Sequence, residues 1–127
     1  MPQIRIETKA GRDKVFLKQF INLTMDAVSD TLHLPAHDRN IRLMEYEPEF
    51  FSSKPPYEFV IEVMLFSGRT KQTKKNLFSK ITNDLNRELG ISKESVIIIL
   101  SEQPKENWGV RGGIPADEID LGFRVEI

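Results

Sequence analysis

Apolar residues follow a strand-like pattern at three places along this chain. Ile4 and Ile6 alternate with polar residues near the start, which is the period-two pattern of a half-buried strand. The run "EFVIEVMLF" (residues 58–66) also reads as a strand, and "SVIIIL" (residues 95–100) is a strand that is apolar on both sides. Sheet structure is therefore expected in both halves of the chain.

Between these strands, apolar residues recur at spacings of three and four, which places them on one face of a helix. In the second half of the chain, Thr70 is the expected N-cap and Gly90 the expected stop. In the first half, Asp13 is the expected N-cap, the helix runs to about Leu32, and Pro35 prevents its continuation. The apolar face of the second helix consists of Leu77, Phe78, Ile81, Leu85 and Leu89.

The two halves of the chain repeat one another. A shift of 57 residues aligns Ile4 with Ile61, and the match continues without a gap to Phe51, which aligns with Trp108. The turn "AGRD" in the first half falls on "SGRT" in the second. The chain therefore consists of two copies of one unit.

The repeated unit predicts an α+β fold. Ile41 and Leu43 align with Ile98 and Leu100 and mark the second strand of a β-α-β unit. The strands of each unit should be parallel and joined by a right-handed crossover. We expect one four-stranded mixed sheet with two helices on one face. The expected single domain, residues 1–127, contains repeat one (2–51), a connector (52–57), repeat two (58–113) and a C-terminal extension (114–127).

Two helices cannot cover both faces of a four-stranded sheet. Val60, Met64 and Phe66 point away from the residues that the helices bury, and so do Ile97 and Ile99. They would form a larger apolar patch than soluble monomers usually expose, so we expect another subunit to cover it in a closed cyclic ring. The terminal "FRVEI" alternates like a short strand and is expected to complete a neighbour's sheet.

Composition narrows the classes of function. The chain has 127 residues, 18 basic and 19 acidic side chains, no cysteine and a formal charge of -1. Attraction to nucleic acid or to a membrane is therefore not expected, and thiol chemistry is excluded. The start lacks the apolar run of a signal peptide, so a soluble, cytoplasmic protein is expected. His33 and His37 have no acidic or thiol partners at ligand spacing, so no metal site is expected.

Two residues are candidates for chemistry because of their positions. Pro2 follows Met1 at the start of a strand, where proline is tolerated because no ladder N–H is needed. Removal of Met1 would turn its nitrogen into a free secondary amine, a base at a fixed place in the fold. Arg69 stands between Gly68 and the Thr70 cap, where its guanidinium and the free N–H groups of the helix start can bind one carboxylate. The alternative for Arg69 is a solvated surface side chain.

Taken together, these features resemble the tautomerase superfamily, which includes 4-oxalocrotonate tautomerase. The features are the proline behind Met1, the β-α-β repeat, Gly-Arg at both strand-to-helix turns, and "ENWGVRGG" (residues 106–113) after the last strand. In size the chain is similar to the fused, double-length members, and "LPAHDR" (residues 34–39) is similar to the malonate semialdehyde decarboxylase group. The resemblance covers nearly the whole chain. It implies a homotrimer that acts without a cofactor.

The resemblance implies a tautomerase that acts on a small 2-oxo or enol carboxylate. Pro2 would be general base and then acid, and Arg69 would anchor the carboxylate. Asp38 would activate water or orient the substrate. The equally favoured alternative is an ordinary turn residue in "PAHDRN", where aspartate makes local hydrogen bonds. The chain has Ser67 where the decarboxylase group has a second arginine, and Ile97 where the short tautomerases have another. Decarboxylation or hydration, and a catalytically inactive ligand-binding or structural homologue, are the alternatives.

Three further residues are candidates for substrate binding. Trp108 would wall the pocket, or it would be a core or interface aromatic. Arg12 is the repeat mate of Arg69 and corresponds to an active-site arginine of the short tautomerases, but in a fused chain it can belong to a relict second site. Arg111 would reach the same pocket or bind a carboxylate of a neighbouring chain.

Overall fold

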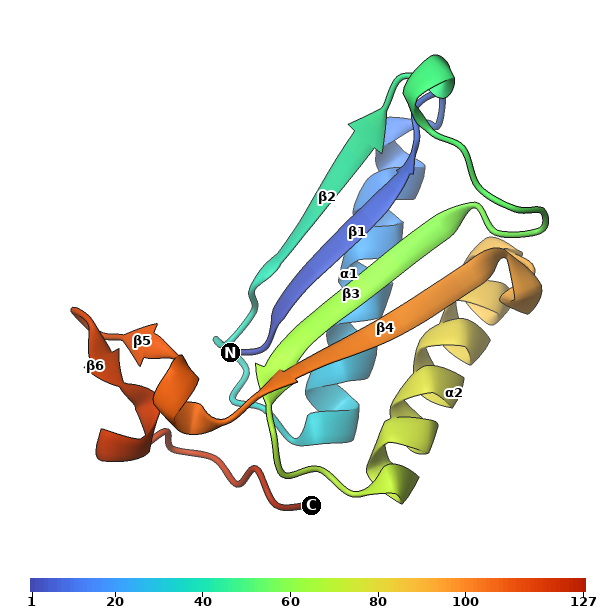
Figure 1. The fold of residues 1–127 in the computed structure, drawn as a ribbon. Helices are drawn as coiled ribbons and strands as arrows, with labels where there is room; N and C mark the ends of the chain where they lie inside the picture. The colour runs from blue at the N-terminus through green and yellow to red at the C-terminus, as the bar shows by residue number, and fades with distance from the viewer.

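The computed structural model describes all 127 residues and contains one mixed sheet covered on one face by two helices (Figure 1). The strand order is β2-β1-β3-β4, and the helices α1 and α2 pack side by side behind the sheet. The predicted α+β fold is therefore confirmed. The elements are β1 (Gln3–Lys9), α1 (Lys14–Leu32), β2 (Ile41–Tyr46), β3 (Phe59–Phe66), α2 (Lys71–Leu89) and β4 (Val96–Gln103).

Strand direction follows the sequence repeat. β1 pairs in parallel with β2, and β3 pairs in parallel with β4. The two units meet along β1 and β3, which are antiparallel, with Gln3 beside Met64 and Thr8 beside Phe59. Because the units run in opposite directions, equivalent turns of the two repeats lie at opposite ends of the sheet. This geometry decides which arginine lies near the start of the chain.

Both helices begin and end close to the expected residues. The side chains of Asp13 and Thr70 each accept a hydrogen bond from a backbone N–H of the first turn, at 2.8 Å and 3.1 Å. α2 ends at Gly90, whose φ of 68° is a left-handed conformation that glycine adopts at little cost. α1 ends in the same way at His33, with φ of 54°, two residues before Pro35.

The main core lies between the sheet and the helices. Alternate residues of β1 and β3 are buried there with most of the apolar faces of both helices, whereas Phe78 of α2, which the sequence places on that face, is 37% exposed. A large apolar side chain contributes about 1.5–3 kcal/mol when it is fully buried, so this layer is the main source of stability. Its largest members are Phe20, Phe59, Ile4, Ile6, Met25, Leu32, Ile61, Leu65, Leu77, Ile81 and Leu85.

The opposite face of the sheet is open in the single chain. Ile97 and Ile99 are 36% and 46% exposed, as the alternation along β4 predicts. Phe66, which the alternation of β3 places on this open face, is instead fully buried. Its ring packs against Ala116 and Val125, because the C-terminal extension folds back over the end of β3. The exposed apolar patch is therefore smaller than the sequence predicts.

A polar network also crosses the open face from strand to strand. Arg5 pairs with Glu62 of the neighbouring strand, which is the favourable cross-strand arrangement, and with Glu7 of its own strand. The hydroxyl groups at the two ends of the network donate hydrogen bonds to its carboxylates. The members are Tyr46 on β2, Arg5 and Glu7 on β1, Glu62 on β3 and Ser101 on β4.

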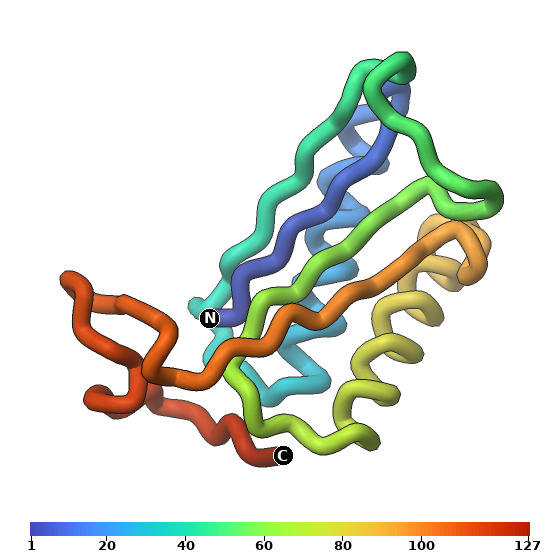
Figure 2. Tube along the Cα trace, viewed as in Figure 1, coloured from blue at the N-terminus to red at the C-terminus, as the bar shows by residue number.

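The C-terminal extension forms a second, smaller cluster at the end of the sheet where β3 ends. A short hairpin of β5 (Gly109–Val110) and β6 (Ile114–Pro115) projects from the body (Figure 1). The tail then returns to the turn before α2, where the Thr70 N–H donates to the Ile127 carbonyl at 3.0 Å (Figure 2). Within the single chain "FRVEI" forms no strand, because its apolar residues pack against the chain's own second cluster. Its pairing with a neighbour's sheet stays a prediction.

Four 3₁₀ turns complete the structure, at Pro48–Phe50, Lys93–Ser95, Lys105–Asn107 and Ala116–Glu118. The first and third turns are related by the 57-residue shift, and the aromatic repeat mates Phe51 and Trp108 follow them directly. The repeat therefore continues past the ends of β2 and β4. Neither α1 nor α2 combines the length and the apolar character needed to cross a membrane.

Candidate active site

The start of the chain lies between two other segments of the fold. Pro2 is buried directly before β1. On one side, the pairing of Gln3 with Met64 sets Pro2 beside the last residues of β3. On the other side, the Ile4 N–H donates to the Asn40 carbonyl at 2.9 Å, which sets Pro2 beside the residues that precede β2. The Pro2 nitrogen is thus held at the end of the sheet where β3 leads into α2 (Figure 1).

Asp38 faces the amino terminus. The terminal ammonium of Met1 forms a hydrogen-bonded ion pair with the Asp38 carboxylate, which also accepts a hydrogen bond from the Asn40 side chain at 2.8 Å. The Asp38 side chain is only 16% exposed, so solvent screens this pair less than a surface pair. Asp38 also has the turn position that was its alternative role, since its backbone N–H donates to the Pro35 carbonyl at 3.0 Å. A carboxylate is therefore held beside the terminal amine.

Arg69 is buried at the same end of the sheet and is not a solvated surface residue; it is 6% exposed. Its Nη1 donates to the Phe66 carbonyl at 3.1 Å, whereas Nε and Nη2 are buried without a partner. Burial lowers the pKa of the Arg69 guanidinium, and the negative charges of Glu102 and Glu126 oppose this shift. A buried cation with free donors is costly unless an anion reaches it. The arrangement is suited to holding a carboxylate.

Trp108 packs at this end of the sheet as well. Its ring meets Phe66 edge-on, with ring centres 4.9 Å apart, and Met1 packs against the same small cluster. The Trp108 carbonyl accepts a hydrogen bond from the Ala116 N–H at 2.9 Å, whereas the indole Nε1 is buried without a partner. The residue thus has a packing role in the second cluster and also lies close to the start of the chain.

Arg12 lies at the opposite end of the sheet. Its Nη1 donates to the Thr8 hydroxyl at 2.9 Å and to the Lys9 carbonyl at 3.2 Å, and its Nη2 pairs with Glu58 at 3.4 Å. The guanidinium also lies 4.4 Å from the centre of the Phe59 ring, a cation–π contact. The antiparallel pairing of β1 with β3 therefore separates Arg12 from the site at the amino terminus.

Arg111 is also outside the group at the amino terminus. It occupies the turn of the β5-β6 hairpin, where it is exposed and has a left-handed φ of 49°. The hairpin projects away from the sheet (Figure 1). Within one chain, the structure thus brings Pro2, Asp38, Arg69 and Trp108 to one end of the sheet and leaves Arg12 and Arg111 elsewhere.

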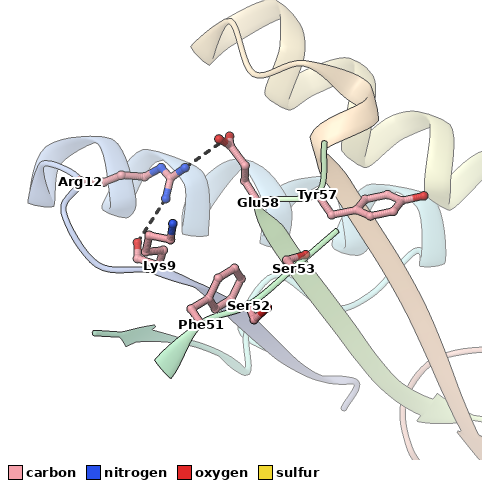
Figure 3. Close-up of a pocket in the computed structure, with 7 residues that line it drawn as sticks. All are labelled: Lys9, Arg12, Phe51, Ser52, Ser53, Tyr57 and Glu58. Carbon is pink, nitrogen blue, oxygen red and sulfur yellow. Dashed lines mark hydrogen bonds and ion pairs between the residues drawn. The ribbon is translucent and has the colours of Figure 1, made fainter. Parts of the chain in front are cut away.

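A surface pocket of about 270 Å³ opens at the Arg12 end (Figure 3). Pro2, Asp38 and Arg69 line none of the four main surface pockets of the single chain. The sequence carries no clear signal for the Arg12 pocket, because five of its seven members come from the connector between the repeats and the residues beside it. We call it the Arg12 pocket and define it by Lys9, Arg12, Phe51, Ser52, Ser53, Tyr57 and Glu58.

The C-terminal tail is a part of the amino-terminal site that sequence reasoning missed. A Cβ added at Gly68, whose φ is 135°, would lie 3.1 Å from the Val125 side chain. The tail therefore presses on the turn that holds Arg69, and only glycine fits both the backbone conformation and the close approach. The one available signal was the alternation in "FRVEI", which indicates that these residues are buried but not which surface covers them.

No group of three or more His, Asp or Glu side chains in the structure is placed to hold a metal ion.

Solved structures with the same arrangement of elements define the class of fold. The structure described as native fused 4-OT matches this chain with a TM-score of 0.83 and 22% identity, over 95% of this chain and 99% of that chain. A malonate semialdehyde decarboxylase structure matches with a TM-score of 0.79 and 23% identity, over 87% of this chain and 92% of that chain. The fold is therefore the double-length, tautomerase-like β-α-β fold.

Sequence relatives identify the family. The family described as "Tautomerase enzyme" matches residues 56–111. The probable tautomerase YusQ of Bacillus subtilis (strain 168) is 28% identical over 121 residues, which are 89% of this chain and 95% of that protein. A probable tautomerase of Staphylococcus haemolyticus (strain JCSC1435), SH1546, is 34% identical over 53 residues, which are 42% of this chain and 86% of that protein. The chain belongs to the tautomerase family, and the resemblance seen in its sequence is confirmed.

Proposed function

We propose that this chain is a tautomerase of small 2-oxo or enol carboxylates, with the Pro2 nitrogen as the proton-transfer group once Met1 is removed. The observation that carries the proposal is the buried Arg69 guanidinium, which has two nitrogens without a partner at the end of the sheet where the chain starts. Membership of the tautomerase family supports an enzyme of this class.

Arg69 is the proposed anchor for the substrate carboxylate. Its Nε and Nη2 form one edge of the guanidinium, the pair of donors that a carboxylate accepts in bidentate fashion. Nη1 is already held by the Phe66 carbonyl, so the fork is oriented before substrate arrives. Because the guanidinium is desolvated, a charge-assisted hydrogen bond to it is stronger than the same bond at the surface. The carboxylate would thereby fix the reacting carbon relative to the chain terminus.

Pro2 is the proposed base and acid. Without Met1, its nitrogen takes the O–H proton of the enol, and the electrons of that bond form the C=O bond. The former C=C electrons then take a proton from the Pro2 ammonium at the neighbouring carbon. One proton moves from oxygen to carbon and no other group is transferred, so the cycle closes with Pro2 neutral. The proline ring restricts the backbone at this position, which keeps the nitrogen in place.

Asp38 favours a second candidate, hydration or decarboxylation of a 3-oxo acid. Its mostly buried carboxylate lies against the Met1 ammonium, next to Pro2 in the chain, where it is able to orient a water molecule or a substrate carbonyl. The likeness in fold to a malonate semialdehyde decarboxylase supports this candidate. Ser67, which stands where the decarboxylase group has a second arginine, counts against it. The tautomerase therefore remains the first proposal.

The proposed assembly is a homotrimer. Ile97 and Ile99 are exposed on the open face of the sheet, and fused 4-OT structures of the same fold are described as symmetric and asymmetric trimers. Sedimentation equilibrium should give the mass of three chains of 14.7 kDa. A concentration-independent monomer mass would contradict this assembly.

Turnover by the mature chain tests the proposed reaction. Intact mass first establishes that Met1 is absent, and ultraviolet absorbance then follows ketonisation of phenylenolpyruvate and 2-hydroxymuconate. Pro2→Ala should lower kcat by about 100-fold, because general acid–base groups contribute roughly 10²–10⁴ to the rate. Pro48→Ala is the matched control, since Pro48 lies in an exposed 3₁₀ turn outside the site, and it should leave kcat unchanged.

Three outcomes separate the candidates. Ketonisation of either enol that depends on Pro2 supports the tautomerase. Release of carbon dioxide from malonate semialdehyde without ketonisation of either enol supports the lyase. A chain that lacks Met1 and shows neither activity, or equal rates for Pro2→Ala and the unchanged protein, rules out the proposed role of Pro2.

A further inference from the structure

The Arg12 pocket occupies the place that the sequence repeat relates to the amino-terminal site. The shift of 57 residues carries Pro2 onto Phe59 and Arg69 onto Arg12. Phe59 and Arg12 are in contact, with the guanidinium 4.4 Å from the ring centre. The pocket beside them is therefore the counterpart of the amino-terminal site, with a phenylalanine in place of the proline.

We propose that the Arg12 pocket binds a small organic monocarboxylate without turning it over. The proposal does not depend on the reaction at Pro2, because it rests on other residues. Lys9 and Arg12 supply two cationic groups and Glu58 supplies one carboxylate, which leaves one net positive charge in the lining. A singly charged anion balances that charge, whereas a phosphate dianion would leave an excess of negative charge.

The lining also matches both parts of an organic acid. In Figure 3, the Phe51, Ser52 and Ser53 side chains lie across the pocket from Arg12. The serine hydroxyls are donors for a carboxylate, and the rings of Phe51 and Tyr57 offer apolar contact for the rest of the molecule. The pocket is smaller than the roughly 300–1,000 Å³ of sites for drug-sized ligands, so the expected occupant is small.

Arg12 is oriented for a ligand before one binds. Its Nη1 is held by the Thr8 hydroxyl and the Lys9 carbonyl, and the plane of its guanidinium packs on the Phe59 ring. Glu58 pairs only with Nη2, at 3.4 Å, and the Glu58 side chain is 60% exposed. An incoming carboxylate can therefore replace Glu58 without disturbing the other contacts, which keeps the cost of ordering the site low. Glu58 acts as an internal competitor for the ligand.

The pocket lacks the group that would make it reactive. The nitrogen of Phe59 is an internal backbone amide, and the Phe59 ring is 2% exposed because it is sandwiched between Arg12 and Phe20. A carboxylate bound beside it meets no proline amine. The Arg12 pocket is thus a binding site, in contrast to its counterpart at the chain terminus.

Benzoate titration of the full ¹⁵N-labelled chain, followed by amide chemical shifts, tests the proposal. Millimolar benzoate should cause saturable shifts in residues 51–53 and 57–58. Lys9→Gln should weaken this binding about two- to five-fold, and Glu58→Gln should tighten it by a similar factor, as expected for partly exposed charges. Lys18→Gln is the matched control, because Lys18 is an exposed lysine of α1 outside the pocket, and it should leave the affinity unchanged.

Opposite signs for Lys9→Gln and Glu58→Gln would support the proposal. Affinity that responds to neither substitution would overturn it, and so would tighter binding of inorganic phosphate than of benzoate. Shifts confined to residues near Arg69 would also overturn it, since benzoate would then occupy only the amino-terminal site. An Arg69→Gln chain separates the two sites, because it should still show the shifts in residues 51–53 even if no reaction occurs at Pro2.

Discussion

The two ends of the sheet carry the same Gly-Arg turn but surround the arginine differently. Arg12 hydrogen-bonds to Thr8, pairs with Glu58 and lies on the Phe59 ring. Arg69 donates only to a backbone carbonyl, and two of its nitrogens have no partner. The second repeat supplies Glu58 and Phe59 as partners for Arg12, whereas the first repeat supplies neither an ion-pair partner nor an aromatic ring for Arg69. A repeat in sequence therefore does not guarantee a repeat in chemistry.

The two arginines also differ in their energetic effect. The charge of Arg12 is balanced by Glu58 and rests on an aromatic face, so the side chain helps to stabilise the fold. Arg69 loses solvation without gaining an ion pair, which destabilises the free protein. Charged groups that are buried without a partner are typical of functional sites. The less satisfied arginine is thus the better candidate for substrate binding.

The largest expected difference between the two ends is catalytic. Arg69→Gln removes the charge and the donor fork, so kcat/KM for the enol substrates should fall about 100-fold, as expected for loss of a charge-assisted contact. Arg87→Gln is the matched control, because Arg87 is 63% exposed on the outer side of α2, and it should leave kcat/KM unchanged. Equal losses in the two variants would show that Arg69 has no special place in the reaction.

Stability should respond in the opposite order. Arg12→Gln loses a cation–π contact and a charge-assisted hydrogen bond, and it should lower the free energy of unfolding by about 1–2 kcal/mol. Arg69→Met replaces a buried, unpaired cation with an apolar side chain of similar length and should raise the free energy of unfolding by about 1 kcal/mol. Urea denaturation measures both values. A larger loss for Arg69→Met than for Arg12→Gln would break the comparison.

The smallest expected effect concerns Tyr46, which lies at the Arg12 end with its ring centre 6.0 Å from that of Phe51. Its hydrogen bond to Glu7 is the main cause that raises the pKa of Tyr46 above its ordinary value. The bond stabilises the folded state below the ordinary tyrosine pKa, and this stabilisation is lost as the pH rises through the raised value.

Spectrophotometric titration measures this shift. The protein has two tyrosines, so a Tyr57→Phe chain reports on Tyr46 alone. Adding Glu7→Gln to that chain should bring the pKa of Tyr46 back towards the ordinary value. An alkaline titration that is the same with and without Glu7 would contradict the assignment of the shift to this hydrogen bond.

Much of the fold could be predicted because its signals are local. Asp13 and Thr70 precede the helices with a side chain that caps the first turn, and Gly90 ends the second helix with a conformation that other residues avoid. The 57-residue repeat then makes the two units equivalent, which leads directly to paired parallel strands. These features depend on a few neighbouring residues and on one alignment.

The site was only partly predictable because it depends on contacts between distant segments. The separation of Arg12 from Pro2 follows from the antiparallel pairing of β1 with β3, which the repeat alone does not specify. Phe66 was misplaced for a related reason, since alternation predicts two faces for a strand but not that a tail covers one of them. Val125, which provides that cover, lies almost sixty residues away along the chain.

The contacts of Met1 bear on the proposed removal of this residue. The Met1 ammonium pairs with Asp38, and its side chain is only 23% exposed against the cluster around Phe66. These contacts tie down a chain end that would otherwise be free. We therefore expect that removal of Met1, which the proposed role of Pro2 requires, takes place before the chain folds. A chain that folds with Met1 still attached would keep the Pro2 nitrogen as a backbone amide, without a usable amine.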